Sequence, residues 1–442
     1  MEENYTYRID SEYFKKDFLL SLKNLEKIEH KILQEISKVR GGKRLPLNEN
    51  FTDVGIPYIR AQDIKGFVKY EDSPKISSDL HNLLKEYQTN FNDVILTIVG
   101  NSIGDVGIVK FHIDKCNLTE NCIKIVELEN IIPEYLYAFL NSKYGQNQII
   151  REKVGTAQPK LAIERIRKFM IPIPSNNFQL KIQEIIKSAH EKLKNSKSLY
   201  SQAEEILLTE LGLKDWQPTE ETKSVRSFKD SFLTSGRLDA EYYQPKYEEI
   251  IEKIKDYQLK TIDDVVNIRK SIEPGSNAYE DNGIPFIRIS DLSKYEITET
   301  EIFLNPEIYN DEELRPKKDT ILLTKDGTLG IAFKVEKDLE IITSGAILHL
   351  TIKEKNILPD YLTLILNSII VQLQAEQDTG GSIIQHWRVE EIKKVIIPIL
   401  PLDIQQTISQ KIQESFKLRK ESKDLLELAK TMVEEAIEKE EI

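Results

Sequence analysis

The chain has 442 residues, 40% of them hydrophobic and 30% charged, with a formal net charge of −12. This length and composition predict two to four soluble globular domains and exclude a disordered or fibrous chain. The apolar runs fall far short of the roughly 20 residues that cross a bilayer, and residues 1–10 are too polar for a signal peptide. Two cysteines, Cys116 and Cys122, cannot build a disulfide framework and lack C-x-x-C spacing, so we expect a reducing cytoplasm.

Charge is distributed unevenly along the chain. Residues 36–175 contain 19 lysines and arginines against 16 acidic residues, whereas residues 265–400 contain 15 against 22. An acidic total taken alone argues against nucleic acid, because phosphate contacts need local lysine and arginine. Since basic loops can gather on one face of an acidic protein, the net charge neither supports nor excludes DNA binding.

The first half alternates short strand-like runs with turn signals, because β-branched and aromatic residues are bounded there by Gly, Asn and Asp. Strands are expected over residues 56–59, 94–99, 107–111 and 122–128. A helix is expected over 133–144, with Pro133 in its first turn. A proline-punctuated strand at 171–174 ends the domain. Residues 1–174 therefore predict a small sheet with helices on it, of class α+β.

A long helix is expected next, within residues 175–212. Residues 179–210 would span about 48 Å at 1.5 Å per residue. Apolar positions recur there at alternating spacings of four and three, which is the heptad pattern of a coiled coil, and Gly212 is expected to end the helix. The positions of this seam are Ile182, Ile186, Ala189, Leu193, Ser196, Tyr200, Ala203 and Leu207.

The second half repeats this order after a linker at 213–234. Strands at 284–287 and 320–324, a helix at 359–370 and a proline-punctuated strand at 397–401 predict a second domain within 235–400. A second long helix is expected within 401–442, with Arg419 in place of Leu193 making that level polar. Its seam consists of Ile408, Ile412, Ser415, Ser422, Leu426, Ala429 and Val433.

Five matches in the same order, at offsets of 226 to 229 residues, indicate that the unit is duplicated. The matching segments are 8–14 with 237–243, 55–60 with 283–288, 93–96 with 319–322, 133–142 with 359–368, and 171–179 with 397–405. The period is too long for a solenoid, so each copy should have its own core. The copies are expected either to pack around a pseudo-twofold axis or to lie along a linker.

The long helices have two interpretations. Each helix can cap its own domain, or the two can pair and hold the domains at a fixed distance. The length of the helices favours pairing, and small residues such as Ala189, Ser196 and Ser415 would let the two axes approach closely.

No catalytic motif was found in the sequence. There is no phosphate-binding G-x-x-x-x-G-K-[ST] or G-x-G-x-x-G loop, no G-x-S-x-G elbow, and no amino-methyltransferase motif. The six histidines show no metal-ligand spacing. Lys325-Asp326-Gly327 lacks one residue of the nucleotidyltransferase K-x-D-G signature, and we interpret it as a loop.

Loops at matching places in both copies contain groups suited to recognition. Residues 41–44 combine two glycines with Lys43 and Arg44, and glycine permits close approach while the basic groups meet phosphate. Residues 155–160 and 380–388 repeat glycine, hydroxyl and amide groups, and arginine and glutamine are able to read base edges bidentately. Each loop taken singly is equally well interpreted as a solvated turn. For Arg60 and Arg288, each followed by an aspartate, a structural salt bridge is an equally good interpretation.

Together these residues resemble the specificity subunit of type I restriction–modification enzymes. The resemblance covers nearly the whole chain in both halves. It depends on the Gly-Gly-Lys-Arg-Leu-Pro loop at 41–46, Gly-Ile-Pro-Tyr-Ile-Arg at 55–60 with Asp63, Asp-Val-Ile-Leu at 93–96, the Gly-Thr-x-Gln loop at 155–158, the Ile-Pro-Ile-Pro strand and the long helix. The second copy departs from the pattern at residues 269–275, where the glycine-rich run is absent and a phosphate contact would depend mainly on Lys270.

The resemblance implies two target-recognition domains that each read half of a bipartite double-stranded DNA site. It also implies an antiparallel coiled coil that spaces them, with pseudo-twofold symmetry, and binds two methyltransferase subunits. A nuclease–translocase subunit would join for cleavage. The chain itself would have no active site, cofactor or metal, while its partners would use S-adenosylmethionine, ATP and Mg. The partners can also supply basic surface around the duplex.

The residues expected to contact DNA follow from the loops and their counterparts. In the first copy they are Lys43, Arg44, Arg60, Gln62, Asn101, Ser102, Thr156, Gln158 and Lys160, and in the second they are Lys270, Arg288, Ser290, Lys325, Thr328, Ser382, Gln385, His386 and Arg388. Three other functions stay open. They are a recognition subunit of a related type II enzyme, a protein-binding coiled-coil scaffold without DNA binding, and an enzyme acting alone on DNA.

Overall fold

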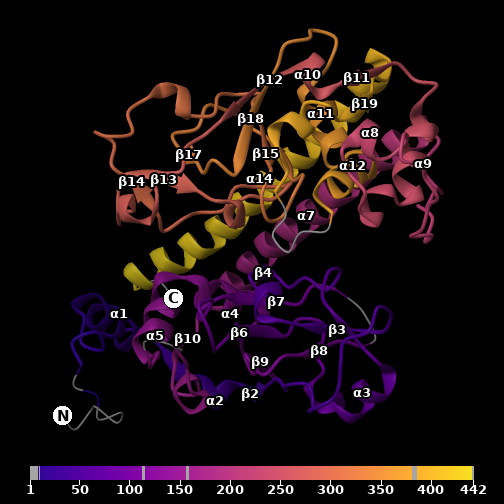
Figure 1. Ribbon diagram of the computed structural model, residues 1–442. Helices are drawn as coiled ribbons and strands as arrows, with labels where there is room; N and C mark the ends of the chain where they lie inside the picture. The colour runs from indigo at the N-terminus through magenta and orange to yellow at the C-terminus, as the bar shows by residue number, and fades with distance from the viewer. Residues whose placement is uncertain (1–7, 9, 112–114, 156–158, 381–385, 441–442) are drawn as a thin grey trace. The chain divides into compact units, whose positions relative to one another are not determined.

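The computed structural model describes residues 8, 10–111, 115–155, 159–380 and 386–440 (Figure 1). The chain forms two compact units. Unit 1 comprises Met1–Lys194 with Leu418–Ile442, and unit 2 comprises Asn195–Lys417. The boundary cuts through both long helices, α7 (Asn176–Glu210) and α14 (Leu402–Glu438), so each unit contains one mixed α/β domain and half of each helix. The division into five segments made from the sequence stays a prediction.

Unit 1 is built on a five-stranded sheet in the order β2-β9-β6-β7-β4. Its neighbours are antiparallel except β4 and β7. A three-stranded sheet, β5-β3-β8, and the two-stranded pair β1-β10 complete the unit. The strands are β1 (His30–Ile32), β2 (Lys38–Gly41), β3 (Ile56–Ile59), β4 (Gly66–Phe67), β5 (Lys75–Ile76), β6 (Val94–Thr97), β7 (Val106–Ile108), β8 (Asn117–Leu118), β9 (Cys122–Val126) and β10 (Met170–Pro172).

Helices pack on this sheet and enclose an apolar core. The core joins strand residues such as Leu96 and Ile123 to Leu136 and Phe139 of α4, all fully buried. The helices of the unit are α1 (Lys16–Glu26), α2 (Leu33–Ile36), α3 (Ser78–Leu83), α4 (Pro133–Asn141), α5 (Lys143–Glu152) and α6 (Ile163–Ile166).

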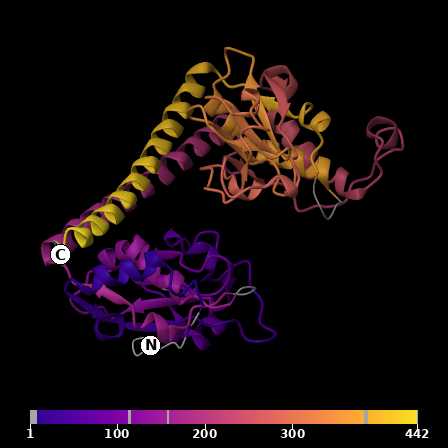
Figure 2. The ribbon, with the colours of Figure 1, turned by 90° about the vertical axis from the view of Figure 1, so that its left-hand side faces the viewer.

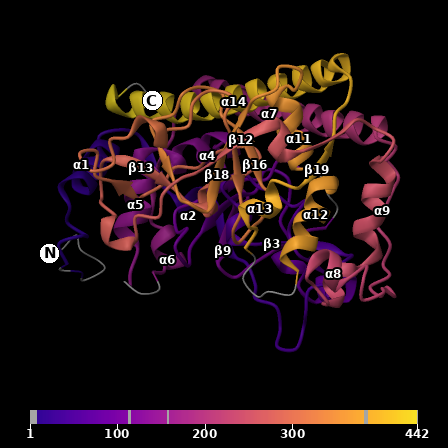
Figure 3. The same cartoon turned by 45° about the horizontal axis from the view of Figure 1, so that its top comes forward.

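Unit 2 repeats the same topology. Its sheets are β12-β18-β15-β16, β14-β13-β17 and β11-β19, which correspond to those of unit 1 without a partner for β4. In Figure 3, α9 lies beside α12, on which it packs. The strands are β11 (Leu259–Thr261), β12 (Val266–Lys270), β13 (Ile284–Ile287), β14 (Phe303–Leu304), β15 (Ile321–Thr324), β16 (Ala332–Lys334), β17 (Ile342–Thr343), β18 (Ile347–Ile352) and β19 (Ile396–Pro398). The helices are α8 (Phe232–Ser235), α9 (Pro245–Ile254), α10 (Ile262–Val265), α11 (Pro359–Leu366), α12 (Ile369–Thr379) and α13 (Val389–Ile392).

The helix expected over 133–144 is in fact two helices. Ser142 adopts an extended backbone (φ −69°, ψ 163°) and caps α5, its Oγ accepting from the N–H of Gly145. A Cβ on Gly145 would lie 2.4 Å from the carbonyl oxygen of Phe139, so glycine permits the tight turn. The single helix expected over 359–370 is likewise divided into α11 and α12. The four strands expected in the first half overlap β3, β6, β7 and β9, with ends that differ by at most three residues.

One sequence match was placed one residue out of register. Asn92 and Asp319 both have a left-handed backbone (φ 69° and 65°), and each N–H donates at 2.8 Å to a carbonyl beyond the neighbouring strand. Asp319 is therefore equivalent to Asn92, not to Asp93 as the sequence match suggested. The loop after β15 is correspondingly one residue shorter than the loop after β6. The offset between the two copies is therefore again 226 residues at Gly104 and Gly330.

Within each unit the segments of α7 and α14 lie side by side and run antiparallel (Figure 2). In unit 1, Ser422 Oγ donates to the carbonyl of Ala189 (2.7 Å), and in unit 2, Ser415 Oγ donates to that of Ser196 (2.7 Å). The structure thus confirms the expected fold class, a duplicated α+β unit with paired long helices. Thirteen of the predicted seam residues are buried, and Leu193 and Leu426 are partly buried. The thirteen are Ile182, Ile186, Ala189, Ser196, Tyr200, Ala203, Leu207, Ile408, Ile412, Ser415, Ser422, Ala429 and Val433.

A glutamine near the start of each long helix docks it on its domain. The side-chain amide of Gln179 accepts from the N–H of Ile132 (2.8 Å) and donates to the carbonyls of Asn130 and Pro174 (both 3.2 Å). Gln405 makes the same three kinds of bond in unit 2. Both side chains are buried, so these bonds satisfy backbone groups that water does not reach. Across the described residues, none of the helices is both long and apolar enough for a membrane span.

Candidate nucleic-acid interface

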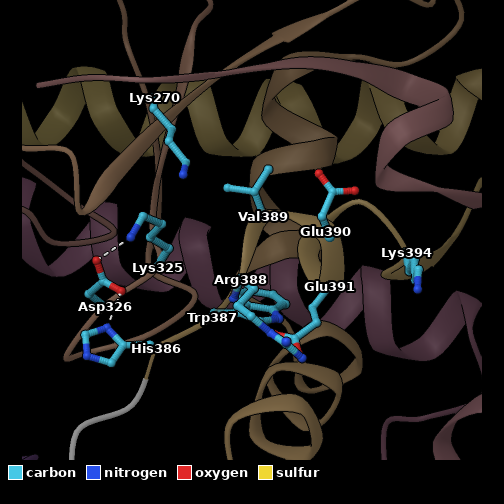
Figure 4. Close-up of a pocket in the computed structure, with 10 residues that line it drawn as sticks. All are labelled: Lys270, Lys325, Asp326, His386, Trp387, Arg388, Val389, Glu390, Glu391 and Lys394. Atoms are coloured by element: carbon cyan, nitrogen blue, oxygen red, sulfur yellow. Dashed lines mark hydrogen bonds and ion pairs between the residues drawn. The ribbon is translucent and has the colours of Figure 1, made fainter. Parts of the chain in front are cut away.

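A pocket of about 540 Å³ lies at one end of the main sheet of unit 2 (Figure 4). Three segments far apart in sequence form it: the end of β12, the loop after β15, and the residues leading into α13 with the turn that follows. It is lined by Lys270, Lys325, Asp326, His386, Trp387, Arg388, Val389, Glu390, Glu391 and Lys394. Lys270, Lys325, His386 and Arg388 were all predicted from the sequence, and the structure brings these four together.

Backbone pairing explains why these segments meet. The strand order places β18 between β12 and β15 and antiparallel to both. β12 and β15 therefore run parallel to each other, and both end at the same end of the sheet. The segment before α13 then joins the loop after β15, because Asp326 bridges His386 and the N–H of Trp387 donates to the carbonyl of Lys325 (2.8 Å).

The buried side chain of Trp387 anchors this segment to the protein. The indole is 1% exposed, and its Nε1–H donates to Asp378 Oδ2 at 3.0 Å. Burial raises the pKa of Asp378 to about 6, an effect that the Trp387 hydrogen bond partly offsets. A buried aromatic with a satisfied N–H is rigid, so the exposed neighbours His386 and Arg388 are held at defined positions.

The pocket combines paired and unpaired charges. Asp326 contacts both Lys325 Nζ (2.5 Å) and His386 Nδ1 (2.8 Å), and Arg388 pairs with Glu391. The ammonium groups of Lys270 and Lys394 form no ion pair with a described residue. In Figure 4, Lys270 and Lys325 lie on one side of the pocket and Lys394 on the other. The ammonium groups of lysines placed in this way are point charges that phosphate oxygens can contact.

The corresponding loops of unit 1 are joined in the same manner. Val99 bridges Lys160, and the N–H of Gly100 donates to the carbonyl of Pro159 (3.3 Å). The structure therefore brings exposed Lys160 beside the loop that contains exposed Asn101 and half-buried Ser102. Thr156 and Gln158 of unit 1, and Ser382 and Gln385 of unit 2, lie outside the described residues.

The glycine-rich loop after β2 presents two exposed cations. Lys43 lies over the ring of Tyr87 (5.9 Å), and Arg44 Nε contacts Glu120 at 2.6 Å. A Cβ on Gly42 would lie 1.9 Å from the carbonyl oxygen of Thr119. The close approach that this glycine permits is thus to the protein's own backbone, which holds the loop against the segment after β8.

Arg60 and Arg288 each make the local salt bridge that the sequence left open. Arg60 Nε lies 3.2 Å from Asp63 Oδ2, and Arg288 Nε lies 3.6 Å from Asp291 Oδ2. In both copies the aspartate also accepts the arginine's backbone N–H at 2.9 Å, which caps a short 3₁₀ turn. Three more predicted residues, Gln62, Ser290 and Thr328, are exposed on nearby turns.

Sequence reasoning missed Lys394, Glu390 and Glu391, which line the pocket. Glu390 and Glu391 lie in α13 and Lys394 follows it, and a four-residue helix gives too little periodicity to detect from sequence. Among the residues that the structure describes, no group of three or more His, Cys, Asp and Glu side chains is arranged to hold a metal ion.

Comparison with known proteins gives consistent similarities. The family model of the type I restriction modification DNA specificity domain matches residues 26–205 and again 254–428. The chain is 22% identical to the type I restriction enzyme MjaIX specificity subunit of Methanocaldococcus jannaschii over 90% of this chain and 89% of that one. It is 29% identical to the EcoBI specificity subunit of Escherichia coli over 34% of this chain and 30% of that one.

The solved structures that match the chain include the S subunit of a type I restriction-modification system from M. genitalium. That match has a TM-score of 0.41 and 15% identity, and it covers 94% of this chain and 96% of the other. The HsdS subunit from Thermoanaerobacter tengcongensis matches with a TM-score of 0.30 and 15% identity, over 92% and 96% of the two chains. From the two matches of the family model, the chain belongs to the type I restriction–modification DNA specificity family and contains its domain twice.

Proposed function

We propose that the chain is the non-catalytic specificity subunit of a type I restriction–modification complex, in which each copy of the domain reads one half of a bipartite DNA site. One observation supports this most directly. Four cationic side chains, Lys270, Lys325, Arg388 and Lys394, converge on one pocket in a segment of the chain that is otherwise acidic. Lys270, Arg388 and Lys394 are exposed and Lys325 is half-buried. Cations around a pocket fit a phosphate backbone, and arginine fits the edge of guanine.

The paired helices would set the spacing between the two readers. A helix of 35 residues, as in α7, extends about 52 Å. Two antiparallel helices of similar length, docked on their domains through Gln179 and Gln405, suit a spacer of fixed length. We further propose that their exposed faces dock two methyltransferase subunits.

The catalytic chemistry would belong to the partners. Methyltransferase subunits would use S-adenosylmethionine, and nuclease–translocase subunits would use ATP and Mg, while this chain would bind no cofactor. The net charge of −12 fits such an assembly, since partner subunits can supply basic surface around the duplex. The complex would act on double-stranded DNA in the cytoplasm.

The test uses the full chain together with its methyltransferase subunits and measures duplex affinity against salt concentration. Replacing both Lys270 and Lys394 by alanine should weaken binding to all duplexes. It should also reduce the slope of log affinity on log salt by about two, one for each lost phosphate contact.

The matched control is Lys337→Ala. Lys337 is exposed and follows β16 at the sheet end away from the pocket, because Lys334 pairs with Ile321 whereas Ala332 pairs with Leu323. An unchanged slope in the double variant would remove the pocket from the interface. A complex that binds no duplex at any salt concentration would favour the scaffold alternative. Methylation or cleavage by the purified chain alone would contradict the non-catalytic assignment.

A further inference from the structure

An arginine–aspartate fork is repeated in the two copies, and the proposed DNA contacts do not use it. Arg8 donates to both carboxylate oxygens of Asp10, through Nε and Nη2 at 2.7 Å each. Arg237 makes the same fork with Asp239, at 2.9 and 2.5 Å. Such bidentate pairs fix the plane of the guanidinium. The fork lowers the pKa of Asp10 to about 2, so the pair stays charged at neutral pH.

The other N–H groups of each guanidinium reach the end of a distant helix. Arg8 Nη1 donates to the carbonyls of Arg151 (2.9 Å) and Lys153 (3.0 Å), at the end of α5. Arg237 donates to the carbonyls of Asp378 (2.9 Å) and Gly380 (3.4 Å), at the end of α12. The last carbonyls of a helix lack a partner within the helix, and a cation there is favourable. Each arginine is therefore a helix cap supplied from about 140 residues away in the sequence.

An aromatic ring completes each cap. The Arg8 guanidinium lies 4.8 Å from the centre of the Tyr13 ring, and that of Arg237 lies 4.4 Å from Tyr242. Carboxylate, helix end and ring thus hold the guanidinium from three directions in both copies. A single surface salt bridge would contribute little to stability. Here the same three kinds of contact recur around the guanidinium in both copies.

The capped helix ends are the points from which the recognition loops start. In the sequence, α5 is followed by the recognition segment 155–160, which ends at Lys160, and α12 by the recognition segment 380–388, which ends at Arg388. The far end of each loop is fixed by its bridge to the loop after β6 or β15. The arginine therefore fixes one end of each loop and the sheet fixes the other.

We propose that Arg8 and Arg237 are positioning residues for DNA specificity, each for the half-site read by its own copy. The inference depends on the proposed function, because it assumes that these loops read DNA. Neither arginine needs to touch DNA. Each acts through the described flanks of its loop, Lys160 in the first copy and His386 with Arg388 in the second.

The test is a binding selection from a random duplex pool by the full chain with its methyltransferase subunits, for wild type, Arg8→Ala and Arg237→Ala. Arg8→Ala should lower base discrimination about tenfold at one half-site and leave the other unchanged, which is the scale of one lost hydrogen bond to a charged group. Arg237→Ala should do the same at the opposite half-site. Each variant is thus the matched control for the other.

A thermal melt of each variant separates positioning from folding. Arg8→Lys and Arg237→Lys keep the charge but cannot hold a carboxylate and two carbonyls at once, so we expect wild-type melting with partial loss at the same half-site. Equal loss at both half-sites, or full discrimination in folded lysine and alanine variants, would overturn the inference. If the wild-type complex enriches no sequence, the proposed function itself fails. If wild type selects a site and the variants select it equally well, only the inference fails.

Discussion

Several arginines expected to contact DNA are already paired with a carboxylate. Arg388 pairs with Glu391 and Arg44 with Glu120, and both arginine side chains are about four-fifths exposed. An ion pair whose cation stays exposed is weakened by solvent screening. In the proposed complex a DNA phosphate would replace the carboxylate as the partner of the guanidinium, which the ion pair holds in place beforehand.

His349 gives the second domain a pH dependence that can be measured. It lies on β18, in the sheet whose end carries the pocket, and is 5% exposed and 2.8 Å from Thr343 Oγ1. Burial, with a smaller effect of nearby Arg269, lowers its pKa from 6.5 to about 4. Between these two pH values the unfolded chain binds a proton that the folded chain does not. The stability that the folded state gains by holding His349 neutral is fully present above pH 6.5 and is lost as the pH falls through 4.

We expect wild type to lose about 3 kcal/mol more than His349→Gln in free energy of unfolding between pH 7 and pH 4. Urea unfolding of both proteins at several pH values measures this difference. Because His349→Gln keeps every other titrating group, the difference between the two proteins isolates the effect of His349. Equal losses in the two proteins would show that His349 is not buried in its neutral form.

At the scale of elements, the close approach of α7 and α14 depends on small residues. Ser422 is 3% exposed and its hydroxyl bonds to the backbone of the facing helix at Ala189. In Ser422→Leu the larger side chain has no space, so we expect a loss of about 1–3 kcal/mol in free energy of unfolding. Asp424→Leu, on the exposed face of the same helix, should change it by less than about 0.5 kcal/mol. Chemical unfolding that finds the two variants equal would contradict close packing of these helices.

The sequence was sufficient for most elements but not for their junctions. Hydrophobic period predicted α7, whose apolar seam recurs over many turns, and the strands β3 and β13, which have turn signals at their ends. It could not predict the division between α4 and α5, because Ser142 and Gly145 interrupt the helix without interrupting its apolar pattern. The register near Asp319 was also missed, since aspartate and asparagine share the left-handed turn position and the neighbouring strand sequences are too alike to fix it.

The candidate site shows the same limit more clearly. Single loops were found by their residue types, and the structure places four of the predicted residues around one pocket. Their proximity arises from sheet pairing between segments that lie more than 50 residues apart, as Lys270 and Lys325 do. No local pattern carries that information. Arg8 and Arg237 were noticed only as a repeat, because their partners are backbone carbonyls, which every residue has.

At the scale of the whole molecule, the duplication conserves the framework and varies the loops. The strand orders and the docking glutamines recur in both units, while Lys325 corresponds to Ile98 and His386 to Lys160. Different side chains at the same structural positions should read different bases. We therefore expect the two half-sites to differ in sequence.

The most direct measurement is the set of sites that the complex of this chain and its methyltransferase subunits binds or methylates in a random duplex pool. We expect two short specified blocks of different sequence, separated by a spacer of fixed length and no specified bases. A single uninterrupted block, two identical blocks at variable spacing, or no enrichment would contradict an account in which two domains each read half of one site.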